Sequence, residues 1–224
     1  MNFPAPGDYI DIHNHGGSPA PGIFCIENLM AHEERTPDSG SGMTFSYGIH
    51  PWHLDPKTYD KHLSRVRTYS GHENTVALGE AGFDRLRGPA FSFQERAFEE
   101  QVAISEEKNK CLFIHCVKGW EELFSVHRRL KPGKPWIIHG FRGKKELARQ
   151  LISRGMYLSF WFDFIVRPES SGLVKALPVD RMFLETDGSG ADIKEIYNKV
   201  SDDLNIGTDM LKEQIYNNFM KLFG

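Results

Sequence analysis

Histidine and carboxylate side chains stand at the ends of six short apolar runs in this chain. They are His13 and His15 after YIDI, His50 after TFSYGI, Glu80 after TVALG, His115 after CLFI, His139 after WII, and Asp187 after MFLET. Imidazole and carboxylate groups are common ligands of divalent cations and common acids and bases in hydrolysis. Each run is typical of a buried strand that gives way to a loop. If the strands run parallel, these groups meet at one rim and predict a metal site there.

The first run carries Asp11, His13 and His15 at alternate positions. Alternate side chains of an extended segment share one face, so these three point the same way. Two imidazoles at this spacing can chelate one ion, and Asp11 is close enough to orient them as a hydrogen-bond partner. The competing interpretation is that the two histidines are solvated or cap the end of the strand. This interpretation is disfavoured because the charged Asp11 on the same face would point into the interior of a barrel.

Glu80 ends an apolar run and is expected to be nearly dry. A buried carboxylate without a partner is costly, and bridging two cations removes that cost. An ion pair with Arg85 is the alternative. His115 and His139 follow apolar residues in the next two runs, and one such histidine alone more often packs in a core. Two histidines in successive strands, both following the strand that ends in Glu80, favour metal binding instead.

Asp187 closes the last run, which is expected to lie beside the first, so it is predicted to complete the ion site of His13 and His15. Capping of a helix that starts near Ala191 is the alternative. Glu185 shares the face of Asp187, and one of the two carboxylates needs a cationic partner. His50 either contacts substrate phosphate, shuttles a proton or fixes the turn before its neighbouring proline.

Apolar runs of strand length alternate along the chain with segments of helical period. Strands are predicted at residues 9–13, 23–27, 44–50, 75–80, 111–115, 136–139, 157–161 and 181–186. Helices are predicted at residues 56–70, 91–110, 120–130, 144–154, 170–177, 192–204 and 208–223.

This alternation predicts an α/β fold, a (β/α)8 TIM barrel that forms a single domain over residues 1–224. The chain is slightly shorter than the usual length of about 250 residues. GGSPAPG after the first strand leaves no room for a helix, and MAHEERTPDSGSG after the second holds at most a turn. An open doubly wound sheet is the alternative, but neither GxGxxG nor GxxxxGK[ST] follows any strand.

The composition is that of an ordinary globular protein, with 40% hydrophobic residues, 25% charged residues and a net charge of −3. No lysine- or arginine-rich tract indicates a non-specific nucleic-acid binder. Three cysteines without paired spacing argue against a disulfide framework. No apolar run reaches the roughly 18 residues of a membrane helix, and the N-terminus has no secretion signal. The expected location is the cytoplasm.

Six motifs occur in the order DIHNH, YGIHPW, ALGEAGFD, FIHC, IHGFRG and LETD. This set resembles the TatD family of metal-dependent deoxyribonucleases, within the amidohydrolase superfamily, from the first strand to the eighth. The resemblance implies a TIM barrel with two divalent cations that hydrolyses phosphodiester bonds in DNA. It also implies the roles of individual residues: His13 and His15 hold one ion, Glu80 bridges both, His115 and His139 hold the second, and Asp187 completes the first site and accepts a proton.

The rim around this ligand set departs from the family's pattern. His115 is followed by a cysteine, a valine and Lys118, where the family has a small residue and then arginine. The family's HCFSG is HGFRG, which places Arg142 near the mouth, and its ETDAPYL-like ending is ETDGSGAD. The sequence therefore supports the reaction, metal-dependent hydrolysis, more directly than it supports DNA as the substrate.

The expected function is hydrolysis of phosphodiester bonds by an activated water, with Glu80 and Asp187 as catalytic residues. Cationic groups are suited to neutralising phosphate oxygens, and the candidates are His50, Arg85, Lys118 and Arg142. The nitrogen-rich ligand set favours two cations of zinc, manganese, cobalt, nickel or iron over magnesium. Aromatic rings expected near the rim are able to stack on bases; they are Trp52, Phe83, Trp120, Phe141 and Trp161.

The expected partner is DNA or another phosphodiester, with no membrane and no obligate protein partner. Two alternatives remain. One is a superfamily enzyme that acts on a small ester, lactone or amide, which the modest net charge and the altered rim would suit. The other is a metal-binding scaffold without turnover, against which the intact ligand set argues.

Overall fold

The structure is a computed structural model that describes residues 3–17 and 20–224. The chain divides into two compact units. The first unit is Asn28–Trp136, and the second comprises the residues up to Glu27 together with Ile137–Gly224.

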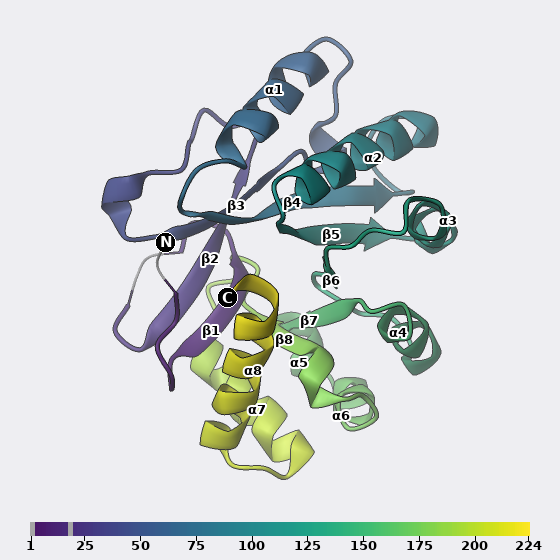
Figure 1. Ribbon diagram of the computed structural model, residues 1–224. Helices are drawn as coiled ribbons and strands as arrows, with labels where there is room; N and C mark the ends of the chain where they lie inside the picture. The colour runs from purple at the N-terminus through teal and green to yellow at the C-terminus, as the bar shows by residue number, and fades with distance from the viewer. Residues whose placement is uncertain (1–2, 18–19) are drawn as a thin grey trace. The chain divides into compact units, whose positions relative to one another are not determined.

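The first unit contains three parallel strands in chain order, each followed by helical structure (Figure 1). The strands are β3 (Thr44–Gly48), β4 (Thr75–Asp84) and β5 (Cys111–Val117), and the helices are α1 (Tyr59–Tyr69), α2 (Phe91–Glu107) and α3 (Trp120–Leu130). Every residue of β3 and β4 is buried. Near-continuous burial is typical of a parallel sheet covered on both faces. Helix α2 covers β4 with one face, on which Ala97, Phe98 and Val102 are buried.

Gly48 allows β3 and β4 to approach closely where the candidate ligands His50 and Glu80 emerge. A Cβ atom at position 48 would lie 2.7 Å from the Cα atom of Gly79 and 2.8 Å from the carbonyl oxygen of Glu80. Any side chain here would push the backbone that carries Glu80, so glycine is required by space.

The second unit contains the first and last strands of the chain side by side. Its strands are β1 (Tyr9–Asn14), the first part of β2 (Ile23–Met30), the last part of β6 (Trp136–Ile138), β7 (Tyr157–Trp161) and β8 (Met182–Glu185). The pairings β1–β2, β6–β7 and β7–β8 are parallel. Its helices are α4 (Lys145–Ile152), α5 (Phe162–Ile165), α6 (Pro168–Val174), α7 (Ile193–Leu204) and α8 (Thr208–Phe223). On α8, Leu211, Ile215 and Phe219 are buried, as their spacing predicts.

The predicted elements are present, with corrections at their ends. Strands β3 and β6 end at Gly48 and Ile138, so His50 and His139 lie in the following turns rather than inside strands. Strand β4 continues past Glu80 to Asp84, and the short helix α5 is additional. After β1, the expected absence of a helix holds for the described residues, with 18–19 lying outside them. After β2 there is a single 3-10 turn, Ser39–Ser41, as expected.

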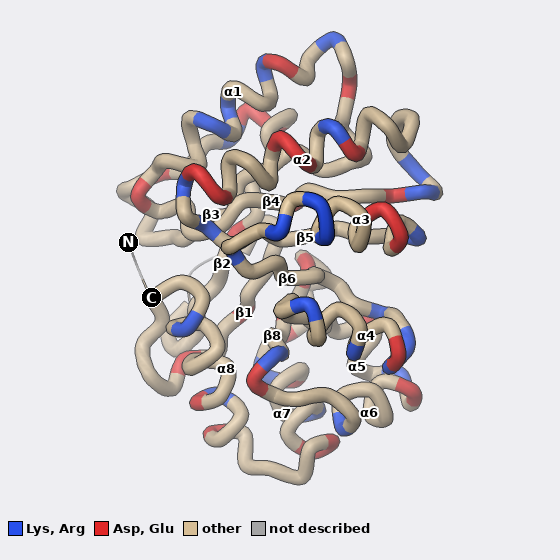
Figure 2. The backbone as a smooth tube through the Cα atoms, turned by 45° about the vertical axis from the view of Figure 1, so that its right-hand side comes forward, with Lys and Arg blue, Asp and Glu red and all other residues tan. Residues whose placement is uncertain are grey.

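Lysine, arginine, aspartate and glutamate alternate along the helices, without a long tract of either sign (Figure 2). Within the described residues, no helix combines the length and apolar character needed to cross a lipid bilayer.

Candidate metal centres

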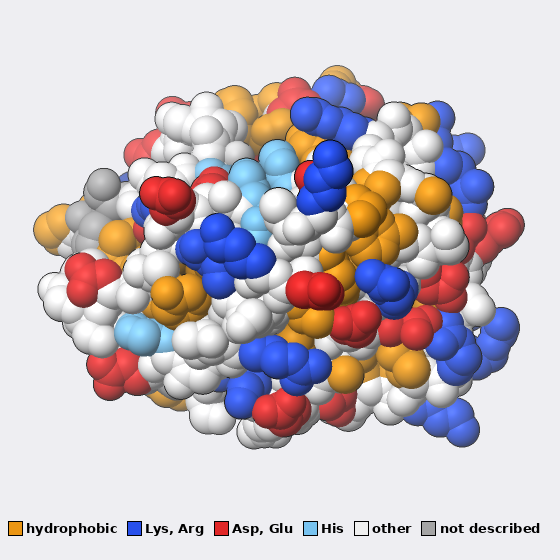
Figure 3. Space-filling view, turned by 90° about the horizontal axis from the view of Figure 1, so that it is seen from above, with side chains coloured by type: hydrophobic (Ala, Val, Ile, Leu, Met, Phe, Trp, Pro, Cys, Tyr) orange, Lys and Arg blue, Asp and Glu red, His pale blue; other side chains and the backbone are white. Residues whose placement is uncertain are grey.

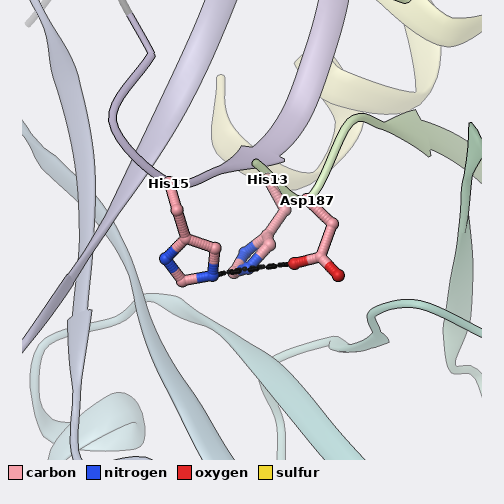
Figure 4. Close-up of side chains that lie close together, drawn as sticks. All are labelled: His13, His15 and Asp187. Carbon is pink, nitrogen blue, oxygen red and sulfur yellow. Dashed lines mark hydrogen bonds and ion pairs between the residues drawn. The ribbon is translucent and has the colours of Figure 1, made fainter. Parts of the chain in front are cut away.

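The second unit brings His13, His15 and Asp187 together, and their side chains point toward one another (Figure 4). The Nε2 atoms of His13 and His15 are 3.3 Å apart. Oδ1 of Asp187 lies 3.8 Å from the first nitrogen and 3.6 Å from the second. His13 is fully buried, whereas His15 and Asp187 are partly exposed. The chain thus forms a triangle of three donor atoms, which we call the first cluster.

The spacing of this triangle fits a cation. Two nitrogens bonded at about 2.0–2.1 Å to a tetrahedral ion lie roughly 3.3–3.4 Å apart. The distance between the imidazole nitrogens of His13 and His15 matches that value. The two imidazoles and the carboxylate form a donor set that suits zinc and other transition metals.

The backbone and Asp11 fix this cluster where β1 and β8 meet. The backbone N–H of Asp187 donates to the carbonyl oxygen of His13 at 3.2 Å, and Asp187 adopts a left-handed φ of 51°. Asp11 accepts from the Thr186 backbone N–H at 3.0 Å, from the Thr186 hydroxyl at 2.6 Å and from Asn14 at 2.9 Å. Burial raises the pKa of Asp11 to about 6, against the lowering effect of these bonds. Asp11 was expected to orient the imidazoles directly, but these hydrogen bonds join the strand ends instead.

His139 lies in the same unit, with its ring centroid 4.6 Å from that of His13. Its Nδ1 atom is 3.6 Å from Oε1 of Glu185. Glu185 is fully buried and accepts from the Ser159 hydroxyl at 2.5 Å and from the Gly140 backbone N–H at 2.6 Å. Burial alone would raise the pKa of Glu185, but the neighbouring His139 and the hydrogen bond from Ser159 outweigh it and hold the pKa below its ordinary value. Glu185 therefore faces an imidazole where the sequence predicted a cationic partner.

The first unit brings together His50, Glu80 and His115, which we call the second cluster. Oε2 of Glu80 lies 3.6 Å from Nε2 of His50 and 3.6 Å from Nδ1 of His115. His50 also caps the turn that follows it, because its Nδ1 accepts from the Trp52 backbone N–H at 3.1 Å. The predicted turn role of His50 is present, and its second nitrogen points toward a carboxylate. Glu80 is buried as predicted, and the cation Arg85 is paired elsewhere.

Asp84 is a buried residue beside the second cluster that sequence reasoning missed. Its Oδ2 atom lies 3.1 Å from Nε2 of His115 and accepts from the Trp52 indole N–H at 2.6 Å. Burial tends to raise the pKa of Asp84, but the hydrogen bonds from Trp52 and His115 outweigh it and lower the pKa. Alternation along a strand was the available signal, because Glu80 and Asp84 are four residues apart on β4 and share a face.

The structure gives the predicted phosphate-binding cations different surroundings. The Arg85 guanidinium pairs with Glu122 and donates to the carbonyl oxygen of Lys118 at 3.0 Å. Lys118 is exposed and has a left-handed φ of 55°. Arg142 lies 3.5 Å from the Asp163 carboxylate and stacks over Trp161, 4.1 Å from the ring centroid.

The aromatic residues predicted near the rim divide by exposure. Phe83 and Phe141 are fully buried in the core, so the prediction that they could stack on bases is wrong for them. Trp52 is exposed over 39% of its surface, and Trp120 and Trp161 are partly exposed.

Comparison with known sequences identifies similar proteins. A sequence model of the family described as "TatD related DNase" matches residues 28–224. The chain is 32% identical over 154 residues to "3'-5' ssDNA/RNA exonuclease TatD" of Cronobacter sakazakii, covering 62% of this chain and 55% of that protein. It is 30% identical over 154 residues to "Uncharacterized metal-dependent hydrolase YabD" of Bacillus subtilis, covering 64% and 58%. The chain thus spans little more than half the length of these relatives.

A solved structure has the same fold. The crystal structure of YJJV, a TatD homolog from Escherichia coli, superposes with a TM-score of 0.78 at 19% identity, covering 96% of this chain and 97% of that chain. Together with the strand order, this likeness confirms the predicted (β/α)8 barrel fold.

Proposed function

Because the chain belongs to the TatD-related DNase family, we propose that it is a metal-dependent hydrolase that cleaves phosphodiester bonds in nucleic acids. The observation that carries the proposal is the first cluster. Its two imidazole nitrogens face each other at 3.3 Å, with a carboxylate oxygen within 3.8 Å of both. A purely structural arrangement has no need to turn three donor atoms to one point.

Two cations are proposed, one for each cluster of donors. His13, His15 and Asp187 would hold the first, and Glu80 with His115 would hold the second. His139 is also proposed as a ligand, because Glu185 on its Nδ1 side leaves Nε2 as the donor. The preponderance of nitrogen favours zinc, manganese, cobalt, nickel or iron over magnesium. When bound, such cations supply Lewis-acid chemistry, lowering the pKa of water and offsetting charge on phosphate.

The residues of the chain supply the acid–base and positioning functions. Asp187 is proposed to accept the proton of the attacking water, for which its partial exposure and position beside the imidazoles suit it. Glu80 is held in a dry environment between His50 and His115, which fixes the direction of its carboxylate. Lys118, exposed beside the end of β5, and Arg142 are proposed to contact phosphate oxygens. His50 faces Glu80 and Arg85 pairs with Glu122, so Lys118 and Arg142 are proposed ahead of them.

The substrate is proposed to be DNA or RNA because the Cronobacter relative is named as an exonuclease of single-stranded DNA and RNA. A panel of substrates tests this proposal, with each divalent cation supplied in turn: single-stranded DNA, single-stranded RNA, an aryl phosphodiester and a lactone. We expect the nucleic acids to be cleaved and the lactone to be left intact. Efficient lactone or amide hydrolysis without nuclease activity would overturn the proposal.

The variants Asp187→Asn and Glu80→Gln are expected to lower turnover by at least about 10²-fold, the scale of a lost general base. Their far-ultraviolet circular dichroism should match that of the parent protein. Matched controls are Asp209→Asn and Glu107→Gln, which change the same groups on exposed helical positions. Retained activity in both cluster variants would contradict the assignment.

A further inference from the structure

An exposed arginine is stacked on an exposed tryptophan beside the second cluster. The guanidinium of Arg87 lies 4.0 Å from the ring centroid of Trp52. Trp52 is 39% exposed and Arg87 is exposed. The Trp52 ring also meets His50 and His115 edge to face, at centroid distances of 4.7 and 5.5 Å. The stack therefore adjoins two imidazoles of the second cluster.

One carboxylate holds this stack and the cluster together. Oδ1 of Asp84 accepts the backbone N–H groups of Leu86 and Arg87 at 2.8 and 3.0 Å. Its Oδ2 accepts the Trp52 indole N–H and lies 3.1 Å from His115. The loop that carries Arg87, the indole ring and a candidate ligand thus share one buried anchor. The stack and the second cluster are therefore linked through the Asp84 side chain.

Arg87 differs in its ion pairing from Arg85 and Arg142, the two arginines that the sequence predicts to contact phosphate. Arg85 pairs with Glu122, and Arg142 lies against Asp163. Within the part of the chain that the structure describes, Arg87 forms no ion pair with a carboxylate. A guanidinium that lies over the face of an aromatic ring can still donate N–H groups to phosphate and stack on a base. On one surface of the molecule, histidine side chains reach solvent with lysine or arginine beside them (Figure 3).

From this geometry we infer that the Trp52–Arg87 stack is a binding platform for a nucleotide of a single-stranded nucleic acid, the base stacking on the platform and the phosphate meeting the Arg87 edge. The inference rests on the proposed function and names the feature of the substrate that this chain recognises, an unpaired base. Stacking does not distinguish bases by their edges, because every base has a π face. The platform therefore selects an unpaired base over a bare phosphodiester, without preference for sequence.

Binding of two labelled oligonucleotides tests the inference. One is a short phosphorothioate thymidine strand that resists cleavage, and the other has the same length and charge but carries abasic sites. Fluorescence anisotropy with the metal-loaded protein should show tighter binding of the thymidine strand, by about 5- to 100-fold, the scale of base stacking on an aromatic side chain. Trp52→Ala and Arg87→Ala should each bind the two strands nearly equally. Arg87→Lys should keep the salt dependence of binding but lose part of the discrimination.

The matched control is Arg96→Ala, which removes another exposed arginine stacked on an aromatic ring, that of Phe93 at 5.0 Å. It should discriminate as the parent protein does. The inference is overturned if the parent protein binds both strands equally, or if Trp52→Ala and Arg87→Ala discriminate like Arg96→Ala. Failure of the proposed function would give a different result: no nucleic acid would be cleaved with any cation, whatever the binding assay shows.

Discussion

The carboxylate of Glu185 faces the Nδ1 atom of His139, with 3.6 Å between the oxygen and the nitrogen. Glu185 is fully buried at the end of β8 and is held by Ser159 and the Gly140 backbone. A carboxylate on Nδ1 fixes the ring orientation and the tautomer of a histidine whose Nε2 binds a metal. We therefore expect Glu185 to position His139, the candidate ligand beside it.

Replacement of Glu185 by glutamine tests this relationship. The amide keeps the shape of the side chain but removes the charge that favours an Nδ1–H proton on His139. Metal affinity is expected to fall by about 10- to 100-fold, as for other residues that orient ligands. Titration of the metal-free protein with zinc or cobalt measures the affinity by calorimetry.

Ser159→Ala is the control for this experiment. It removes one hydrogen bond to Glu185 and leaves the charge in place, so we expect a smaller loss of affinity than for Glu185→Gln. Equal metal affinity in Glu185→Gln and the parent protein would show that His139 is oriented without this carboxylate.

Most of the fold was predictable because strands and helices have different hydrophobic periods. The strand Tyr157–Trp161 and the helices Trp120–Leu130 and Thr208–Phe223 have the predicted bounds. Errors occur where a strand passes into a turn. His139 follows three apolar residues and reads as part of a strand, yet the turn at Gly140, with a left-handed φ of 56°, begins beside it. Periodicity carries no information about where hydrogen bonding between strands stops.

The candidate ligands were predictable because polar groups at the ends of apolar runs are unusual. The buried carboxylates behind them were harder to predict. Asp11 has hydrogen bonds to Thr186, a contact across 175 positions that depends on β1 lying beside β8. Asp84 accepts a hydrogen bond from Trp52, which is 32 positions away in the sequence. Such partners follow from the register and the loop path, which local sequence does not encode.

Removal of divalent cations should lower the thermal stability of the protein. A ligand present at 100 to 1,000 times its Kd stabilises the folded state by about 2.7 to 4.1 kcal/mol. For a chain of this size, that corresponds to a shift in Tm of roughly 5–15 °C. Differential scanning calorimetry before and after dialysis against a chelator measures the shift. The double variant His13→Ala/His15→Ala should show a smaller shift, and superimposable melting curves for the parent protein with and without chelator would argue against both metal sites.

His62 gives the protein a sensitivity to acid that is independent of the clusters. It is buried on α1, and burial, followed by the charge of His32, lowers its pKa from the ordinary 6.5. Below pH 6.5 the unfolded chain binds a proton at this site before the folded chain does, so stability falls as the pH falls. His62→Gln should lose less stability than the parent protein between pH 7.5 and pH 5. Urea unfolding at both pH values measures the difference, and parallel losses in the two proteins would exclude His62 as a source.

The three cysteines should be unreactive in the folded protein. Burial raises the pKa of Cys111 to about 12. Burial, together with the charge of Asp11, also raises the pKa of Cys25. Burial raises the pKa of Cys116 as well, against the lowering effect of a backbone hydrogen bond. The thiolate is the reactive form, and at pH 8 it is a minute fraction of each thiol. Ellman's reagent at pH 8 should therefore modify the native protein far more slowly than a free thiol and modify all three cysteines promptly in guanidinium. Rapid modification of one native cysteine would show that its surroundings stabilise the thiolate, and single Cys→Ser variants would identify which one.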